Sequence, residues 1–302
     1  MSIHATVLWN PSAGSATQAA TAREIIEQRN DLELLECSSW EALVSCAAEA
    51  ARRSEVLIAA GGDGTVNAVA NGILQGNPSC PLLILPVGTG NDLARSLDVA
   101  ADPVAALAML EEPTIAQIDT IRYRTNQGSN RFFNMGTGGL SGSVIRNVDA
   151  DTKRFWGPFA YFAEAAHQLR EMESYEVCIS IDQGPPVGYR IVNFLVANGT
   201  TTAGGLRVAP NALLDDGFME VILVLESSLA DLAVLASKLL VGEHLDAERV
   251  VHLRAKQLQL EGAAIMSADG DIIADSGPIF LELDERALSV LVGPQSSLVE
   301  ST

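Results

Sequence analysis

The sequence predicts an α/β domain with a parallel sheet, followed by a second domain rich in β-strands. The first prediction follows from short apolar runs that alternate with longer helical patterns, which is typical of βαβ units. The second follows from a change near residue 117, after which apolar residues recur with a period of two. A chain of 302 residues is long enough for two domains, and we place them at residues 1–122 and 123–285.

The elements of the first domain follow from these runs in order. The predicted strands are residues 5–10, 32–37, 56–60 and 82–85. The predicted helices are residues 16–28, 40–53, 66–74, 91–97 and 103–110. The strand at 56–60 is apolar throughout, which predicts that it is buried.

The second domain is predicted from its period-two segments. These are residues 117–124, 131–135, 176–181, 189–198, 218–225, 251–253, 257–260, 272–274, 279–283 and 287–292. Helices are expected at 159–172 and 229–240, and Gly184-Pro185-Pro186 is typical of a hairpin loop.

Composition excludes several classes of function. The formal charge is -19 with only 19 Lys and Arg, which argues against a nucleic-acid partner and against strong attraction to an anionic membrane. Any contact with a lipid is therefore expected to be apolar or brief. No segment approaches the roughly 20 apolar residues of a spanning helix, so we expect a cytoplasmic protein without stable membrane insertion. The four cysteines lack metal-ligand spacing.

A glycine-rich loop follows the buried strand at 56–60 and reads Gly61-Gly62-Asp63-Gly64-Thr65-Val66-Asn67. A strand, a glycine loop and a helix in this order direct backbone N–H groups toward an anion. Asp63 would repel a phosphate unless a divalent cation lay between them, so the loop indicates an Mg²⁺-nucleotide. The alternative is a simple turn in which Asp63 caps the helix.

Two further loops follow predicted strands of the same sheet. They are Asn10-Pro11-Ser12-Ala13-Gly14 with Ser15, and Pro86-Val87-Gly88-Thr89-Gly90-Asn91-Asp92. Ligands of open α/β sheets bind at the carboxyl edge, where these three loops are expected to meet. Together they predict a nucleotide site, although the Walker and dinucleotide fingerprints are both absent.

Two carboxylate clusters lie far downstream, Asp215-Asp216-Gly217 and Asp269-Gly270-Asp271. In phosphoryl transfer, one carboxylate accepts the proton of the attacking hydroxyl and another binds a cation. Asp-Gly is also the favoured pair of a type I′ hairpin turn. Local sequence leaves both interpretations open.

These motifs, in this order, resemble the diacylglycerol kinase catalytic-domain superfamily, in particular its bacterial soluble lipid kinases. Sphingosine kinase and NAD kinase are relatives of that family. The resemblance covers nearly the whole chain and includes the run from Asn134-Met135-Gly136 to Gly139. It implies an NAD kinase-like and phosphofructokinase-like α/β domain, a β-sandwich, a cleft between them and a C-terminal tail, about residues 286–302, that packs on the first domain.

The resemblance also implies roles for individual residues. Asp271 would be the catalytic base, although the usual residue there is often the longer glutamate, and Asp63 would share an Mg²⁺ with ATP. A structural Mg²⁺ would be held by Asp216 with the carbonyls of Leu213 and Phe218. The implied ATP-binding residues are Asn10, Pro11, Ser12, Ala13, Gly14, Gly61, Gly62, Asp63, Gly64, Thr65, Val66, Asn67, Gly88, Thr89, Asn91 and Asp92.

The leading hypothesis is a kinase that transfers the γ-phosphate of ATP to the hydroxyl of diacylglycerol or a related lipid at a membrane surface. The alternatives are a kinase of a soluble substrate, in the manner of NAD kinase, and a nucleotide-binding protein without turnover. The sequence identifies neither the acceptor nor the oligomeric state, for which a homodimer stays open. Aromatic residues that would suit either an acyl groove or a core are Phe132, Phe155, Trp156, Phe159, Tyr161 and Phe162.

Overall fold

The computed structural model describes residues 3–11, 16–139, 174–262, 265–274 and 276–298. It divides the chain into two compact units, which are Met1–Thr120 with Glu285–Thr302, and Ile121–Asp284. The boundaries fall within strands β5 (Ile115–Thr125) and β17 (Ile279–Leu291). We call the two parts unit 1 and unit 2.

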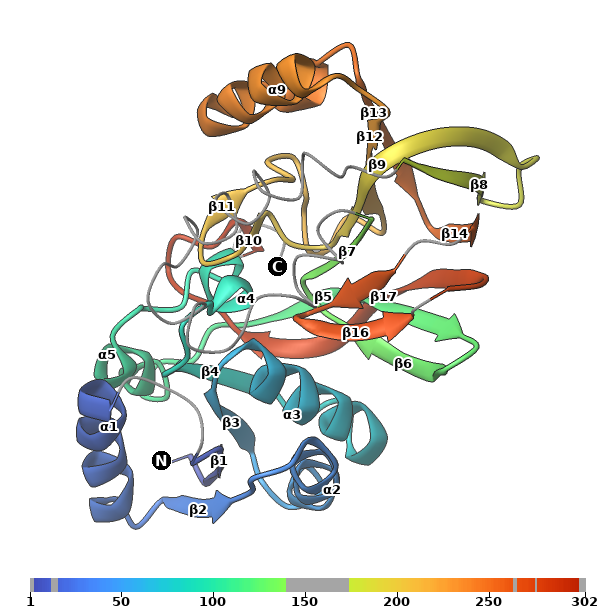
Figure 1. Cartoon of the computed structure of the whole chain (residues 1–302). Coiled ribbons are helices and arrows are strands. Elements are labelled where there is room, and N and C mark those ends of the chain that lie inside the picture. Colours follow the sequence, from blue (N-terminus) through green and yellow to red (C-terminus); the bar gives the residue numbers. More distant parts are fainter. Residues whose placement is uncertain (1–2, 12–15, 140–173, 263–264, 275, 299–302) are drawn as a thin grey trace. The chain divides into compact units, whose positions relative to one another are not determined.

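Unit 1 contains a parallel sheet in the order β17-β4-β3-β1-β2 (Figure 1). Its strands are β1 (Ala5–Trp9), β2 (Leu32–Glu36), β3 (Val56–Gly61) and β4 (Leu82–Pro86), with the end of β17 beside β4 through Val290 and Leu82. Every residue of β1, β3 and β4 is buried. Continuous apolar strands are those of a sheet covered on both faces, so the α/β prediction is confirmed.

The helices of unit 1 are α1 (Ala16–Gln28), α2 (Trp40–Ala50), α3 (Asp63–Gly76), α4 (Asp92–Ser96) and α5 (Pro103–Ala108). Helices α2 and α3 lie side by side (Figure 1) because two glycines of α3 allow a close approach. A Cβ on Gly72 would lie 2.5 Å from the Cβ of Ala47, and one on Gly76 would lie 2.2 Å from the carbonyl oxygen of Ala48. This packing fixes α3, which begins at Asp63 rather than at residue 66 as predicted, so most of the predicted glycine loop forms the first turn of the helix.

The C-terminal segment of unit 1 is bound by main-chain hydrogen bonds. Val292 N–H donates to the carbonyl of Thr114 over 3.0 Å, and Gly293 N–H donates to that of Leu97 over 2.9 Å. Earlier in β17, the N–H of Arg286 donates over 2.7 Å to the carboxylate of Asp119, a buried residue of β5.

Unit 2 is formed mainly by antiparallel strands in the order β16-β15-β7-β9-β8-β14-β17, with β12 and β13 continuing from β9. Beyond β5 and β17, the described strands are β6 (Gly128–Phe132), β7 (Met135–Gly139), β8 (Tyr175–Ile181), β9 (Val187–Ala197), β10 (Thr201–Thr202), β11 (Leu206–Arg207), β12 (Met219–Leu225), β13 (Val250–Ala255), β14 (Gln257–Gly262), β15 (Met266–Ala268) and β16 (Asp271–Ala274). Helix α9 (Leu229–Val241) and the 3₁₀ helix η2 (His244–Asp246) lie between β12 and β13. The β-rich prediction is confirmed.

Two strand predictions in this part of the chain were wrong in detail. Residues 131–135 do not form one strand, because the N–H groups of Phe133, Asn134 and Met135 bind the carboxylate of Asp269 between β6 and β7. Residues 279–283 and 287–292 are not two strands, since β17 runs continuously through a left-handed residue, Arg286, at φ 48°. That irregularity interrupts the period-two pattern without ending the strand. The predicted helix at 159–172 lies outside the described residues.

Candidate functional site

Three loops of unit 1 follow the carboxyl ends of β1, β3 and β4. The register pairs Trp9 with Ala60 and Gly61 with Pro86, so the three strands end at the same level. The side-chain amide of Asn10 donates to the Thr65 hydroxyl over 3.1 Å, which links the first loop to the second. The structure therefore brings these described parts of the predicted loops together at one edge of the sheet.

The two glycine loops after β3 and β4 contact each other through their backbones. A Cβ on Gly88 would lie 2.3 Å from the Cα of Gly62, and one on Gly61 would lie 2.2 Å from the Thr65 hydroxyl. Atoms cannot approach that closely, so both positions require glycine for space rather than for an unusual φ. By contrast, a Cβ on Gly64 would have no atom within 4 Å.

Helix α3 begins directly after this contact, with Gly62 as its N-cap residue. Because glycine has no side chain, the N-cap residue Gly62 makes no side-chain hydrogen bond to the start of α3. The N-terminus of a 14-residue helix carries partial positive charge and N–H groups that suit an anion. The first turn of α3 is thus the part of this edge best suited to a phosphate.

Asp63 links the glycine loop after β3 to the glycine loop after β4. Its Oδ2 accepts the N–H of Asn91 over 3.0 Å, and its Oδ1 accepts the N–H of Asp92 over 2.9 Å. Asp63 therefore caps α4 rather than its own helix, in which it is the first residue. The space is tight, since a Cβ on Gly90 would lie 2.2 Å from Asp63 Oδ2.

Sequence reasoning missed one basic residue at this edge, Arg95. Its guanidinium donates to the carbonyl of Gly90 and lies 3.6 Å from the carboxylate of the buried Asp92. Arg95 follows the Asn91-Asp92 pair by one helical turn, and that spacing was the available signal. It brings one positive charge to a group of loops that contain no lysine.

In unit 2, Asp269 is fixed by backbone donors. Its carboxylate accepts the N–H groups of Phe133, Asn134 and Met135 over 2.9, 3.2 and 3.1 Å. Ala268 pairs with Asp271, while Asp269 and Gly270 have φ values of 47° and 96°. The hairpin interpretation is therefore confirmed for this cluster, as a two-residue turn with both central residues at positive φ.

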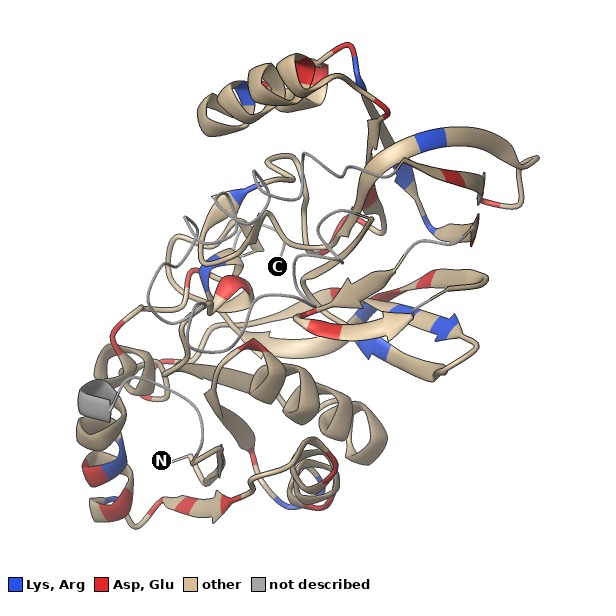
Figure 2. Ribbon diagram, in the orientation of Figure 1, with Lys and Arg blue, Asp and Glu red and all other residues tan. Residues whose placement is uncertain are grey.

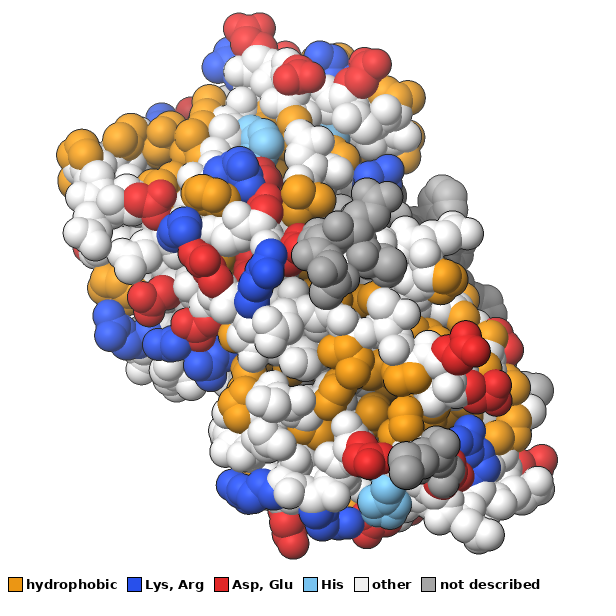
Figure 3. Space-filling model, turned by 180° about the vertical axis from the view of Figure 1, so that it is seen from behind, with side chains coloured by type: hydrophobic (Ala, Val, Ile, Leu, Met, Phe, Trp, Pro, Cys, Tyr) orange, Lys and Arg blue, Asp and Glu red, His pale blue; other side chains and the backbone are white. Residues whose placement is uncertain are grey.

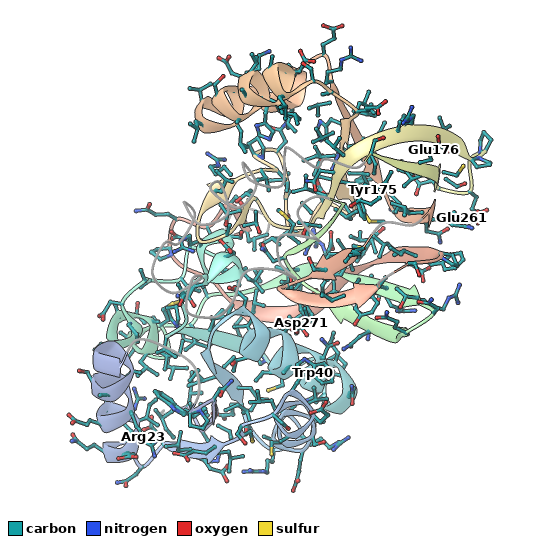
Figure 4. The ribbon with its side chains drawn as sticks, viewed as in Figure 1. Arg23, Trp40, Tyr175, Glu176, Glu261 and Asp271 are labelled. Atoms are coloured by element: carbon teal, nitrogen blue, oxygen red, sulfur yellow. The ribbon has the colours of Figure 1, made fainter. Side chains whose placement is uncertain are left out.

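Asp271 follows that turn as the first residue of β16 (Figure 4), and it is exposed. Burial, followed by the negative charges of Asp271 and Asp269, raises the pKa of Tyr123. The hydroxyl of Thr125, on the same strand as Tyr123, donates to the carbonyl of Ile273 over 3.0 Å. The turn thus fixes the carboxylate of Asp269, while Asp271, which follows it, is exposed.

The Asp215-Asp216-Gly217 cluster is held by an arginine. Asp216 accepts the N–H of Phe218 over 3.0 Å and pairs with the guanidinium of Arg254. The Nε of Arg254 lies 3.1 Å from the buried Glu220, and its guanidinium carbon lies 4.4 Å from the centre of the Phe218 ring. Glu220 and Arg254 face each other across β12 and β13, so the strand register itself supports this pair.

The structural Mg²⁺ expected at Leu213, Asp216 and Phe218 would have to share Asp216 with Arg254. One oxygen of Asp216 accepts the N–H of Phe218, and the other pairs with the charged Arg254, which would compete with a cation for that oxygen. Across the described residues, no group of three or more His, Cys, Asp or Glu is suited to hold a metal ion.

Several predicted residues lie outside the described part of the chain. They are Ser12, Ala13 and Gly14 of the first loop and the aromatic residues Phe155, Trp156, Phe159, Tyr161 and Phe162. Phe132 is described and belongs to the main hydrophobic core of unit 2. The described part of the chain contains no helix that is both long and apolar enough to cross a membrane.

Comparison with known proteins gives matches over both units. A family model for the diacylglycerol kinase catalytic domain matches residues 4–123, and one for the YegS C-terminal NAD kinase beta sandwich-like domain matches residues 136–292. The chain is 30% identical to the diacylglycerol kinase of Staphylococcus saprophyticus over 274 residues, which cover 88% of each protein. It is 32% identical to that of Staphylococcus carnosus over 235 residues, which cover 77% of this chain and 75% of the relative.

Solved structures of low sequence identity have the same fold. A diacylglycerol kinase from Bacillus anthracis gives a TM-score of 0.70 at 20% identity, covering 97% of this chain and 98% of that one. An NAD kinase from Archaeoglobus fulgidus, solved in complex with ATP, gives 0.52 at 14% identity with 99% of both chains covered. The expected α/β domain and NAD kinase-like β-sandwich are both confirmed.

Proposed function

The chain belongs to the diacylglycerol kinase family, and we propose that it transfers the γ-phosphate of ATP to the hydroxyl of diacylglycerol or a related lipid. The observation that carries the proposal is the link between the two glycine loops through Asp63. That link holds a helix N-terminus and two backbone turns at one sheet edge, as a phosphate site requires.

The nucleotide is proposed to bind at this edge of unit 1. Amides at the start of α3 would donate to phosphate oxygens, and Gly64 in that turn is exposed. Asn10 supports the same turn through Thr65. Positioning and electrostatic stabilisation supply most of the catalysis in phosphoryl transfer, so a preorganised loop pair suits this reaction.

Asp271 is proposed as the catalytic base. As the lipid hydroxyl oxygen bonds to the γ-phosphorus, the bond from that phosphorus to the β–γ bridging oxygen breaks and ADP leaves. The hydroxyl proton passes to the carboxylate of Asp271. Asp269 has no such role, because three backbone donors already hold its carboxylate.

Asp63 would hold an Mg²⁺ together with the nucleotide. Its donor chemistry fits the ion, because a carboxylate is a ligand that Mg²⁺ prefers and the donors from Asn91 and Asp92 are neutral amides, which do not neutralise its negative charge. When bound, Mg²⁺ neutralises the charge that develops on the transferred phosphate. Asp216 differs from Asp63, because its carboxylate forms an ion pair with the guanidinium of Arg254.

The test is an assay with radiolabelled ATP against a panel of lipids in detergent micelles, with NAD as a soluble acceptor. We expect label in diacylglycerol or a closely related lipid and none in NAD. Label in NAD alone would favour the alternative of an NAD kinase-type enzyme, whose fold the chain shares. ATP binding without any labelled product would favour a nucleotide-binding protein without turnover.

A further inference from the structure

Helix α9 is well formed by local signals alone. Ser228 and Asp231 form a capping box, in which the Ser228 hydroxyl accepts the N–H of Asp231 over 3.2 Å and Asp231 accepts the N–H of Ser228 over 3.1 Å. The helix ends at Gly242, a left-handed residue with φ 79°. These caps stabilise the helix without requiring that it be buried.

The apolar composition of α9 is not matched by its burial. The helix lies wholly within the described residues, and none of its 13 residues is buried. Leu229, Val234, Leu240 and Val241 are 53%, 56%, 72% and 69% exposed. A helix that is apolar on most sides is normally covered by protein or by lipid.

The exposed apolar residues of α9 lie on one side, and the exposed Asp231 lies at the edge of that side. At 100° per residue, the half-buried Leu232, Leu235 and Leu239 share a side, and Leu239 packs on a small core of unit 2 that contains Leu195 and Ile222. The opposite side is exposed and is here called the outer face of α9. It is formed by Leu229, Ala230, Ala233, Val234, Ser237, Leu240 and Val241.

The clustering of these side chains is local. Among the described residues, the large exposed hydrophobic side chains outside α9 are Val104, Ile115, Val187, Leu213 and Ile272, which come from five different segments. Single exposed apolar residues are ordinary, whereas a continuous apolar surface indicates an interaction site. Figure 1 shows α9 beyond the ends of β12 and β13, the strands that it connects.

The outer face carries no charge, and this indicates the kind of partner that it would contact. The chain has a formal charge of -19, yet none of the seven residues of this face is charged. The remaining side chains of α9 include one acid, Asp231, and one base, Lys238, so the helix is neutral overall. Figure 2 shows α9 tan over most of its length, and Figure 3 shows acidic and basic side chains interspersed on the rear face of the molecule.

From these observations we propose that the outer face of α9 docks on a lipid surface by apolar contact and not by charge. An amphipathic helix lies in a membrane interface with its apolar face among the acyl chains. An acidic protein is repelled by anionic headgroups, so an uncharged face is the surface that matches a lipid layer best. The proposal rests on the proposed function, since a kinase of diacylglycerol must reach a substrate held in such a layer.

The test is co-sedimentation with phosphatidylcholine vesicles that contain diacylglycerol, at low and at high salt. The variant carries Val234→Asp and Leu240→Asp together, and the control is Val187→Asp, an exposed apolar residue of β9 in the same unit. We expect the wild type and the control to bind equally at both salt concentrations, and the double variant to bind at least tenfold more weakly. Both variants are expected to melt at the wild-type temperature, because the changed side chains are exposed.

Three kinds of result would overturn the proposal. In the first, the double variant binds the vesicles as the wild type does, or the wild type does not bind them. In the second, the wild type sediments as a dimer in the absence of lipid and the double variant as a monomer, which would make the outer face an interface between two copies of the chain. Binding that requires anionic lipid or disappears at high salt would contradict apolar docking.

A second readout separates this proposal from the proposed function. With a short-chain, water-soluble diacylglycerol, the double variant should transfer phosphate as fast as the wild type, while its rate on vesicles falls about tenfold. If neither protein phosphorylates the soluble lipid, the proposed function fails, and the sedimentation result still decides on α9. Equal rates on vesicles for both proteins would count against docking by α9.

Discussion

The carboxylate of Asp63 holds the backbone of Asn91, whose N–H donates to it over 3.0 Å. Asn91 lies in the left-handed region at φ 54° and precedes α4. Asp63, an acidic residue among amides suited to phosphate, therefore also orders the loop that contains Asn91. Because one carboxylate serves both loops, a change at Asp63 alters the whole edge of the sheet.

Asp63→Asn should weaken ATP binding by about tenfold or more. An amide keeps only one oxygen, so the N–H of Asn91 or Asp92 loses its acceptor, and an unsatisfied buried donor costs about 1–3 kcal/mol. Calorimetric titration with ATP measures the change. The control is Asp102→Asn, since Asp102 caps α5 through Ala105 and asparagine is an equally good N-cap residue. Unchanged affinity in Asp63→Asn would contradict the role of the link.

Gly88→Ala and Gly64→Ala should differ in stability. The new Cβ at Gly88 meets the Cα of Gly62, so the loops must separate and the melting temperature should fall by several degrees. At Gly64 the Cβ is unobstructed and alanine favours a helix, so the melting temperature should be unchanged or higher. ATP should bind more weakly to both variants. Equal thermal stability of the two variants would argue against close contact between the loops.

Arg254→Gln should destabilise unit 2 by about 2 kcal/mol. The substitution removes the charge that faces the buried Glu220, but Arg254 is partly exposed, so the effect falls below that for a fully buried pair. Chemical denaturation measures the loss, and Arg249→Gln, at an exposed position before β13, is the control. Chelation with EDTA should leave the stability of the wild-type protein unchanged. A large loss on chelation would mean that a metal ion holds the Asp216 turn instead.

The cysteines should differ in their reactivity toward a thiol reagent at pH 8. Burial raises the pKa of Cys80 to about 11, and burial together with the hydrogen bond between Cys37 and Cys46 raises that of Cys37 to about 12, so both stay protonated. Cys178 is exposed on β8. Mass spectrometry after brief labelling should find Cys178 modified first, and Cys37 and Cys80 modified only after unfolding. Fast labelling of Cys80 in the native protein would contradict the packing of unit 1.

The sequence predicted well those features that depend on neighbouring residues. Apolar runs located β1, β3 and β4, and the glycine motifs located the loops that follow them, because strand burial and turn geometry leave local signals. The capping box of α9 lay directly before the helix that the sequence predicted.

Features that depend on distant contacts were not predictable from local patterns. Asp269 binds the amide of Phe133 across 136 positions of sequence, and that bond divides the segment expected to be a single strand. Arg254 pairs with Asp216 from 38 positions away, a contact that the Asp215-Asp216-Gly217 motif does not indicate. The hydrogen bonds of Asp63 to the loop after β4 likewise depend on β3 and β4 being neighbours in the sheet, and the spacing of the motifs in the sequence does not show that.

Asp269 and Asp271 provide the most direct test of the central claim, since two carboxylates of one turn are assigned different roles. Asp269→Asn should lower the melting temperature, because an amide cannot replace a carboxylate that accepts three N–H groups. Asp271→Asn should leave the melting temperature unchanged, because its side chain is exposed.

The deciding measurement is the rate of phosphate transfer from ATP to diacylglycerol by Asp271→Asn, made together with its affinity for ATP. Loss of the base should lower the rate by about 10²–10⁴-fold while ATP binds as in the wild-type protein. A rate equal to that of the wild type would contradict the assignment of Asp271 as the base.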